Sequence, residues 1–178
     1  MTPLDAEDPS VRAHLARPRK CIQSDADMHI WQQSDAHHTI LLFLMQLSEA
    51  CVMQPTRDVV WHERETYAAS DSVIDRVLAL LIELDTWTDE IVPDTGPHRF
   101  GNLAFRTWGA RLQERAEALL RRCLPPQLHA FITELYAFLV DAFGSVVRFD
   151  YGTGHELHMV AWLAYLYRLG ALSEEGAE

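Results

Sequence analysis

The chain has 178 residues, which suits one domain or part of one, and 48% are hydrophobic, as in packed globular proteins rather than disordered ones. Its formal net charge of −11, from 15 Lys+Arg and 26 Asp+Glu, argues against nucleic acid or an anionic membrane as the main partner, although a local basic pocket remains compatible. Three widely spaced cysteines without a CxxC motif fit reduced thiols, and the start MTPLDAEDPS does not resemble a signal peptide. We therefore expect a soluble protein of the cytoplasm, with the nucleus as a further compartment.

The first 17 residues are polar and acidic without clear periodicity, so we expect a mobile segment before a domain spanning residues 18–178. Ser24 followed by Asp27 predicts a capping box that opens a short helix. Ser34 and Asp35 predict the start of a longer helix. The apolar stripe of this helix would consist of Ile40, Leu41, Leu44, Met45 and Leu47.

The second half of the chain also has helical periodicity. Apolar residues at spacings of three and four predict a helix over 70–89, capped by Ser70 or Ser72, and the segment EIVPDTGPHRFG that follows predicts a loop. A helix then resumes near Asn102 and ends before Pro125-Pro126.

Two further helices complete the prediction. One runs from Leu128 until Gly144 breaks it, and the last runs from about His155 to Gly170, a natural position for a C-terminal glycine cap. Since no strand-like alternation appears, we predict an all-α fold.

The stretch RFDYGTGHE, residues 148–156, is the most unusual in the chain. Its glycines on either side of Thr153 would allow positive φ and a close approach of the backbone to a ligand, and the N–H groups of a helix starting there would favour an anion. Asp150, His155 and Glu156 add two carboxylates and a titratable ring. A phosphate-binding turn, a magnesium anchor and an acid/base site are all compatible with this pattern.

A structural alternative for the same stretch is a tight corner in which Asp150 caps the next helix. HELH places His155 and His158 at i and i+3 rather than in the HExxH spacing of zinc proteases, so a zinc site is not predicted. No metal ligands are assigned.

HRFGNLAFRTW, residues 98–108, has a similar form, with a glycine loop opening a helix. Arg99 and Arg106 could bind phosphate oxygens, and Asn102 could cap the helix or contact a ligand. The structural alternative is that these arginines pair with Asp150 or Glu156 and tie two loops together. The aromatic residues of the stretch are expected in the core, or one of them in the wall of a pocket. They are Phe100, Phe105 and Trp108.

Together, RFGNLAFRTW and FGSVVRFDYGTGHELHMVAWLAYLYRLG resemble the phosphotyrosyl phosphatase activator family, the activators of protein phosphatase 2A. PRKCIQSDADMHIWQQSDAH and IELDTWTDEIVP are similar to further stretches of that family, so the resemblance covers about residues 18–172. It implies an all-α activator fold, binding to the phosphatase catalytic subunit or its scaffold complex, and dependence on ATP and Mg²⁺ at a site shared with the phosphatase. It also implies an attributed peptidyl-prolyl cis/trans isomerase activity, with a proline-containing peptide as substrate.

By this resemblance, site residues transfer onto matching positions. The cofactor-binding group would be Arg99, Gly101, Asn102, Arg106, Thr153 and Gly154. The isomerase group would be Asp150, Tyr151, Gly152, His155 and Glu156. Isomerisation needs no covalent step, only desolvation of the X–Pro amide or a hydrogen bond to its nitrogen, which lowers a barrier of roughly 18–20 kcal/mol.

Two departures from the family pattern stand out. Phe143-Gly144-Ser145 replaces the family's Phe-Gly-Asn, and nothing matches its second motif, Glu-Pro-Ala-Gly-Ser-x-Gly-Val-Trp-Gly-Leu-Asp-Asp. The C-terminal part of the fold is therefore expected to be missing, which would expose Trp162, Leu163 and Leu166 of the last helix. The alternatives to an activator are a non-catalytic module that binds the phosphatase, and an unrelated helical protein with a structural glycine corner.

Overall fold

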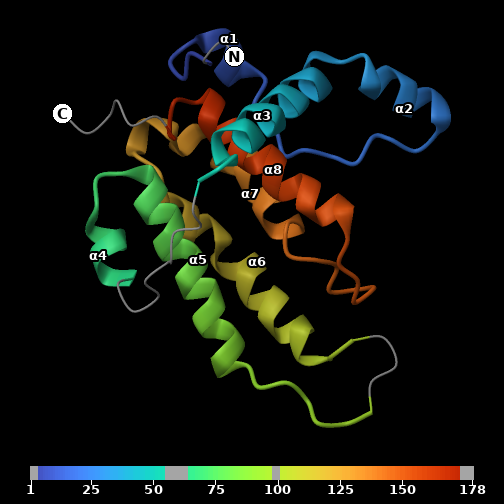
Figure 1. Ribbon diagram of the computed structural model, residues 1–178, viewed down its shortest axis with the longest axis vertical. Coiled ribbons are helices and arrows are strands. Elements are labelled where there is room, and N and C mark those ends of the chain that lie inside the picture. The colour runs from blue at the N-terminus through green and yellow to red at the C-terminus, as the bar shows by residue number, and fades with distance from the viewer. Residues whose placement is uncertain (1–3, 55–63, 98–100, 173–178) are drawn as a thin grey trace.

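The computed structural model describes residues 4–54, 64–97 and 101–172, and these residues are helical with one isolated antiparallel bridge between Ser145 and Asp150. The predicted all-α fold is confirmed (Figure 1). The helices are α1 Pro9–Ala13, α2 Asp25–Gln32, α3 Asp35–Cys51, α4 Arg64–Ala69, α5 Val73–Glu90, α6 Ala104–Cys123, the 3-10 helix η2 Pro126–Phe131, α7 Ile132–Asp141 and α8 Thr153–Arg168. None of the described helices is long and apolar enough to cross a membrane.

Serine caps begin three of the helices, as their sequence predicts. Ser24 and Asp27 form a reciprocal capping box at α2. The Ser34 side chain accepts a hydrogen bond at the start of α3, and Ser72 accepts one at the start of α5. At the other end of the chain, Gly170 follows α8 with φ of +71°, the left-handed conformation that a glycine cap supplies.

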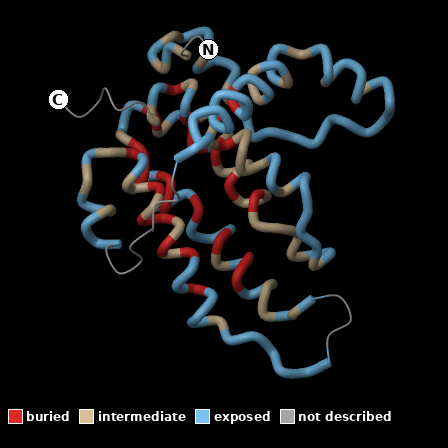
Figure 2. Tube along the Cα trace, in the orientation of Figure 1, coloured by how far each residue is buried: buried red, intermediate tan, exposed pale blue. Residues whose placement is uncertain are grey.

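The core lies between α5, α6, α7 and α8, where buried residues line the facing sides of the helices (Figure 2). Helix α8 is anchored in this core, because Trp162 and Leu166 are fully buried and Leu163 is partly buried. The expectation that the last helix exposes these residues is therefore wrong, since α7 and α3 both pack against α8 and these residues belong to the shared core.

The sequence patterns do not predict two short helices, α1 in the N-terminal segment and α4 before α5. In the N-terminal segment, Leu4, Val11 and Leu15 pack against the core. The Leu4 N–H also donates to the Arg168 carbonyl at 2.7 Å. The sequence pattern does not predict α1, because a five-residue helix has too few apolar positions to show a periodicity.

The three cysteines lie in two different environments, which predicts their reactivity. Cys21 and Cys51 are exposed, whereas Cys123 is buried and its burial raises the pKa of its thiol to about 12. We expect two thiols to react quickly with a disulfide reagent at pH 8, and the third only after a denaturant is added. Fast reaction of all three thiols in the folded chain would contradict the packing of α5 against α6.

Candidate functional site

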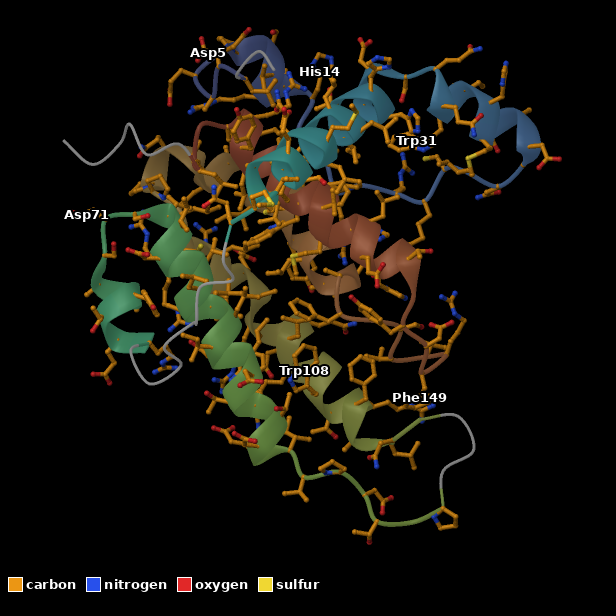
Figure 3. All side chains as sticks on the ribbon, in the orientation of Figure 1. Asp5, His14, Trp31, Asp71, Trp108 and Phe149 are labelled. Carbon is orange, nitrogen blue, oxygen red and sulfur yellow. The ribbon has the colours of Figure 1, made fainter. Side chains whose placement is uncertain are left out.

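The two glycine-containing motifs lie against each other at one end of α6. A Cβ atom on Gly101 would lie 3.0 Å from the Cβ of Phe149, and the guanidinium of Arg106 lies 4.6 Å from the centre of the Phe149 ring. Phe149, which is labelled in Figure 3, belongs to the loop between α7 and α8. The Arg106 Nε–H also donates to the Val146 carbonyl at 3.4 Å. Segments 40 to 48 residues apart in sequence thus lie against each other and form one continuous face.

The loop between α7 and α8 is a tight turn closed by its own backbone. The Ser145 N–H donates to the Asp150 carbonyl at 3.0 Å, and the Phe149 N–H donates to the Ser145 carbonyl at 2.7 Å. Gly144 has φ of +115° and Phe149 has φ of +56°, so the left-handed conformations that the turn requires lie at these two residues.

Gly152 and Gly154 have the predicted room for a close approach of the backbone to a ligand, but not the predicted positive φ. Neither has a positive φ; Gly152 is extended and Gly154 is in the first turn of α8. A Cβ atom at either position would meet no atom of the chain within 4 Å. Both backbones therefore face open space, where a ligand or partner can approach closely.

The first turn of α8 has no side-chain cap. Gly152 is the N-cap residue, and the carboxylate of Asp150 binds the Arg148 Nε–H at 2.7 Å instead of capping the helix. The alternative in which Asp150 caps α8 is therefore wrong. The exposed residues Thr153 and Gly154 begin the helix, where backbone N–H groups have no carbonyl partner within the helix and favour an anion.

His155 is held in a fixed orientation between two aspartates. Its Nδ1 lies 2.6 Å from the Asp141 carbonyl, and because a carbonyl only accepts, Nδ1 carries the proton. Its Nε2 then faces Asp150 Oδ1 at 3.8 Å, and its ring stacks on Tyr151 with centroids 5.9 Å apart. Asp150, Tyr151 and His155 are thus brought together as predicted, whereas Glu156 is exposed in the first turn of α8.

Sequence reasoning missed Asp141, the last residue of α7. Its Oδ2 lies 2.9 Å from Lys20 Nζ and 3.6 Å from His158 Nε2, in addition to the bond of its carbonyl to His155. Asp141 therefore joins the segment before α2 to the start of α8. No local signal marks it, because a carboxylate at the end of an apolar helix is usual on a protein surface.

A cavity of about 250 Å³ lies under the α7–α8 loop. It is lined by aromatic and aliphatic side chains of α6 and α7, with polar groups at its margin. Among the lining residues are Lys20, Trp108, Asp141, Gly144, Arg148 and His155. Because ligand pockets usually measure about 300–1,000 Å³, this cavity would hold at most a small group.

The residues of the first motif have mostly structural contacts. The Asn102 side chain accepts from the N–H groups of Asp94 and Ala104 and donates to the Asp94 carbonyl, so it closes the loop before α6. Arg106 contacts the Val146 carbonyl and the Phe149 ring. The structural alternative in which Arg106 pairs with Asp150 or Glu156 is therefore wrong. Arg99 lies outside the described residues.

Nothing in the described part of the chain groups three His, Cys, Asp or Glu side chains in a way that could hold a metal ion. A nucleotide fits only part of the assigned group, because the Asn102 amide is bonded to Asp94 and Ala104 and Phe149 lies against Gly101, whereas Thr153 and Gly154 are open to solvent. The phosphates would therefore be bound at the start of α8 rather than by the Asn102 amide.

Asp150 remains ionised well below neutral pH. The hydrogen bond from Arg148 is the main cause that lowers the pKa of this carboxyl, followed by the charges of Arg148 and His155. A base suited to proton transfer near pH 7 needs a pKa raised toward that value, so Asp150 is an acceptor and anchor rather than a general base.

The lowered pKa of Asp150 predicts how the stability of the protein depends on pH under acidic conditions. Because the folded pKa of Asp150 lies below the ordinary value of about 3.9, its contribution to stability is complete above that pH and is lost as the pH falls through the folded pKa. An NMR titration of carboxyl carbons should place the midpoint of Asp150 below the ordinary value for aspartate, and Arg148→Ala should return it toward that value. An unchanged midpoint in that variant would contradict the pairing.

Comparison with known proteins agrees with this arrangement of two motifs on a helical scaffold. The family model described as "Phosphotyrosyl phosphate activator (PTPA) protein" matches residues 18–178. The chain belongs to this family.

Individual relatives give the same result. A protein of Mycosarcoma maydis named serine/threonine-protein phosphatase 2A activator 1 is 51% identical over 156 residues, covering 88% of this chain and 31% of the relative. A probable serine/threonine-protein phosphatase 2A activator 1 of Dictyostelium discoideum is 33% identical over 162 residues, covering 91% and 47%.

A solved structure confirms the fold. The crystal structure of the PP2A phosphatase activator Ypa1 matches with a TM-score of 0.76 and 30% identity, covering 90% of this chain and 50% of that one. The chain thus spans between about a third and a half of the length of these relatives.

Proposed function

We propose that this chain takes part in the activation of protein phosphatase 2A and contacts the phosphatase catalytic subunit, or its scaffold complex, through the face formed by the two motifs. The main support is the contact of Gly101 and Arg106 with Phe149, which presents both motifs on one side of the molecule. The phosphatase 2A activator names of the relatives support the identity of the partner. This activity belongs in the cytoplasm, and in the nucleus as well.

We also propose that ATP and Mg²⁺ act at a composite site completed by the phosphatase. Thr153 and Gly154 would bind phosphate oxygens through backbone N–H groups, with Arg99 and Arg106 of the first motif in the proposed role of charge partners. The metal would be bound by the phosphates and the partner, since the described residues offer no cluster of three ligands. When bound, Mg²⁺ neutralises phosphate charge.

The attributed prolyl isomerase activity is the third part of the proposal. Tyr151 has 62% of its surface exposed, so its ring, held by stacking on His155, offers an apolar surface for a proline ring. Gly152 leaves room for a peptide backbone. Asp150 and Glu156 would accept hydrogen bonds from peptide N–H groups, with the X–Pro amide desolvated against the tyrosine.

A non-catalytic phosphatase-binding module is the second candidate. One observation favours it: the polar groups of Asn102 are bonded within the chain. Such a module would bind the phosphatase without nucleotide and without activating it.

Capture experiments separate these candidates. The chain is immobilised and incubated with purified phosphatase catalytic subunit, with and without ATP and Mg²⁺, and phosphatase activity is then measured. Capture enhanced by ATP, followed by reactivation, supports the activator. Capture that is independent of ATP and gives no reactivation supports the module, and no capture at all contradicts both.

Gly154→Ala provides a sharper test of the same face. The added methyl meets no atom of the chain and replaces a helical glycine, so the free energy of unfolding should stay equal or rise by about 0.5–1 kcal/mol. If the phosphatase or a phosphate approaches this backbone closely, capture should fall at least about tenfold, equivalent to about 1.4 kcal/mol. Gly170→Ala, beyond α8, is the control: its φ of +71° makes alanine unfavourable by about 1–2 kcal/mol, but capture by the folded chain should stay unchanged.

A further inference from the structure

Two histidines at the start of α8 have the same kind of partner at each ring nitrogen. His155 and His158 lie one turn apart on the helix, with ring centroids 6.5 Å apart. The Nδ1 of His155 lies 2.6 Å from the Asp141 carbonyl, and the Nδ1 of His158 lies 2.7 Å from the Gly154 carbonyl. Because a carbonyl only accepts, the proton of each neutral ring lies on Nδ1, and each Nε2 has a lone pair.

Each Nε2 atom faces the carboxylate of an aspartate. His155 Nε2 lies 3.8 Å from Asp150 Oδ1, and His158 Nε2 lies 3.6 Å from Asp141 Oδ2. While the rings are neutral, each of these contacts joins two acceptors, and both distances exceed that of a normal hydrogen bond. A second proton on a ring turns its Nε2 into a donor and places a positive charge opposite the carboxylate. Protonation can therefore create two charge-assisted hydrogen bonds that the neutral rings cannot form.

The contact of His155 with the α7–α8 loop can take up this proton without losing another bond. Arg148 Nε donates to Asp150 Oδ2, so the other oxygen, Oδ1, is left to His155. The hydrogen bond from Arg148 also lowers the pKa of Asp150, so this carboxylate stays ionised where histidine side chains take up a proton. The His155 side chain is only 13% exposed, with the Tyr151 ring stacked on it, so solvent screens the pair less than a surface ion pair.

The contact of His158 with α7 has a competitor. Lys20 Nζ lies 2.9 Å from Asp141 Oδ2, the same oxygen that faces His158. A protonated His158 therefore shares Asp141 with Lys20, and we expect the smaller response at this ring. The other charged or titratable groups in the wall of the cavity beside His158 are Arg19 and Cys21, while α2 and α3 contribute the apolar side chains Trp31 and Ile40.

We propose that the pairs His155–Asp150 and His158–Asp141 form a proton-controlled latch, which we call the α8 latch. At mildly acidic pH the protonated rings bind the loop and the end of α7, so the start of α8 is tied to both (Figure 1). This stabilisation is lost as the pH rises and the rings become neutral. The latch thereby controls how firmly the open backbone at Gly152 and Gly154 is held. Its effect on phosphatase binding rests on the function proposed above.

Hydrogen exchange in the isolated chain tests the latch. Amide protection factors, which correct for the intrinsic effect of pH on exchange, are measured at about pH 5.5 and pH 8, on either side of the usual histidine range. The reporters are the N–H groups of Ser145 and Phe149, which bond within the loop, and that of His155 in the first turn of α8. Relative to amides of α6, their protection should be at least about fivefold higher at the lower pH.

Asp150→Asn distinguishes the latch from a general effect of pH. The asparagine oxygen can still accept from Arg148, and its amide can donate to the neutral Nε2 of His155. This half of the latch then stays closed at both pH values, so protection of the loop should remain high at pH 8.

His155→Gln removes the titrating ring, so protection of the loop should no longer depend on pH. His158→Gln should remove the smaller part of the difference, because Lys20 still binds Asp141. His38→Gln, at an exposed position of α3, is the matched control and should keep the full difference of the unchanged chain.

Capture of the phosphatase catalytic subunit at the same two pH values tests the functional consequence. A loop that is already ordered loses less conformational entropy on binding, so the ratio of capture at low pH to capture at high pH should exceed that of Asp150→Asn. The variant serves as the reference because the phosphatase itself also responds to pH. Absence of capture at both pH values would contradict the proposed function but not the latch, which the exchange of the isolated chain tests separately.

Three results would overturn the latch. Protection factors that are equal at both pH values would show that no bond forms on protonation. A pH difference that persists in His155→Gln would place its origin elsewhere. An Nε2–H tautomer of His155 at pH 8, read from the ¹⁵N chemical shifts of its ring, would mean that the ring already donates to Asp150 without a second proton.

Discussion

Replacing Gly144 by alanine should destabilise the protein by about 2–4 kcal/mol. Its φ of +115° is unfavourable for any residue with a Cβ atom, and the added Cβ would lie 3.0 Å from the Asp150 carbonyl and 3.3 Å from the Phe105 ring. Neither neighbour can move freely, since the first is backbone of the same tight turn and the second packs beside the core. Urea unfolding monitored by circular dichroism measures the loss.

Gly154→Ala is the internal control for this measurement, because it lies ten residues away in open space and has no positive φ. The two substitutions add the same methyl group, so a difference between them reports backbone conformation and contact alone. Equal stability of the two variants would show that the α7–α8 loop can relax, and would contradict its role as a rigid support for Asp150 and Tyr151.

Trp108→Ala should have the larger effect, a loss of about 3–5 kcal/mol. The indole of Trp108 is buried against three aromatic rings, those of Trp87, Phe105 and Phe143, and its N–H donates to the Leu84 carbonyl at 3.2 Å. Trp108 therefore joins Trp87 of α5 to Phe105 of the first motif and to Phe143, which precedes the α7–α8 loop. Its removal should therefore also reduce capture of the phosphatase by disordering the motif face.

Trp108→Phe separates packing from hydrogen bonding. It retains one aromatic ring but removes the indole N–H, which leaves the Leu84 carbonyl without this donor, so an intermediate loss of about 1–3 kcal/mol is expected. If Trp108→Ala reduced capture while leaving the unfolding midpoint unchanged, Trp108 would be a contact residue rather than a core residue.

Some features of the fold follow from local sequence patterns, and others depend on contacts between residues far apart in the chain. The caps at Ser24, Ser34 and Ser72 could be predicted because each is made within four residues. Short helices such as α1 could not, since their stability comes from packing on distant residues rather than from their own periodicity.

The glycines show the same limit within one motif. The sequence marks Gly144, Gly152 and Gly154 as permissive positions, but it does not say which of them needs that freedom. The tertiary structure requires this conformational freedom at Gly144, where the Asp150 backbone lies close by. It leaves empty space beside Gly152 and Gly154. Similarly, Arg148 rather than Arg106 binds Asp150, because the turn brings residues 148 and 150 together while Arg106 lies over Phe149.

By itself, the sequence determined the helical class, most helix boundaries and the two motifs, because these depend on neighbouring residues and on a pattern specific to one family. Only the tertiary structure decided that Asp141 supports His155, that Trp162 is covered and that His155 and His158 each face an aspartate. Each of these depends on which helix packs on which, and such packing is set by contacts between residues far apart in the chain.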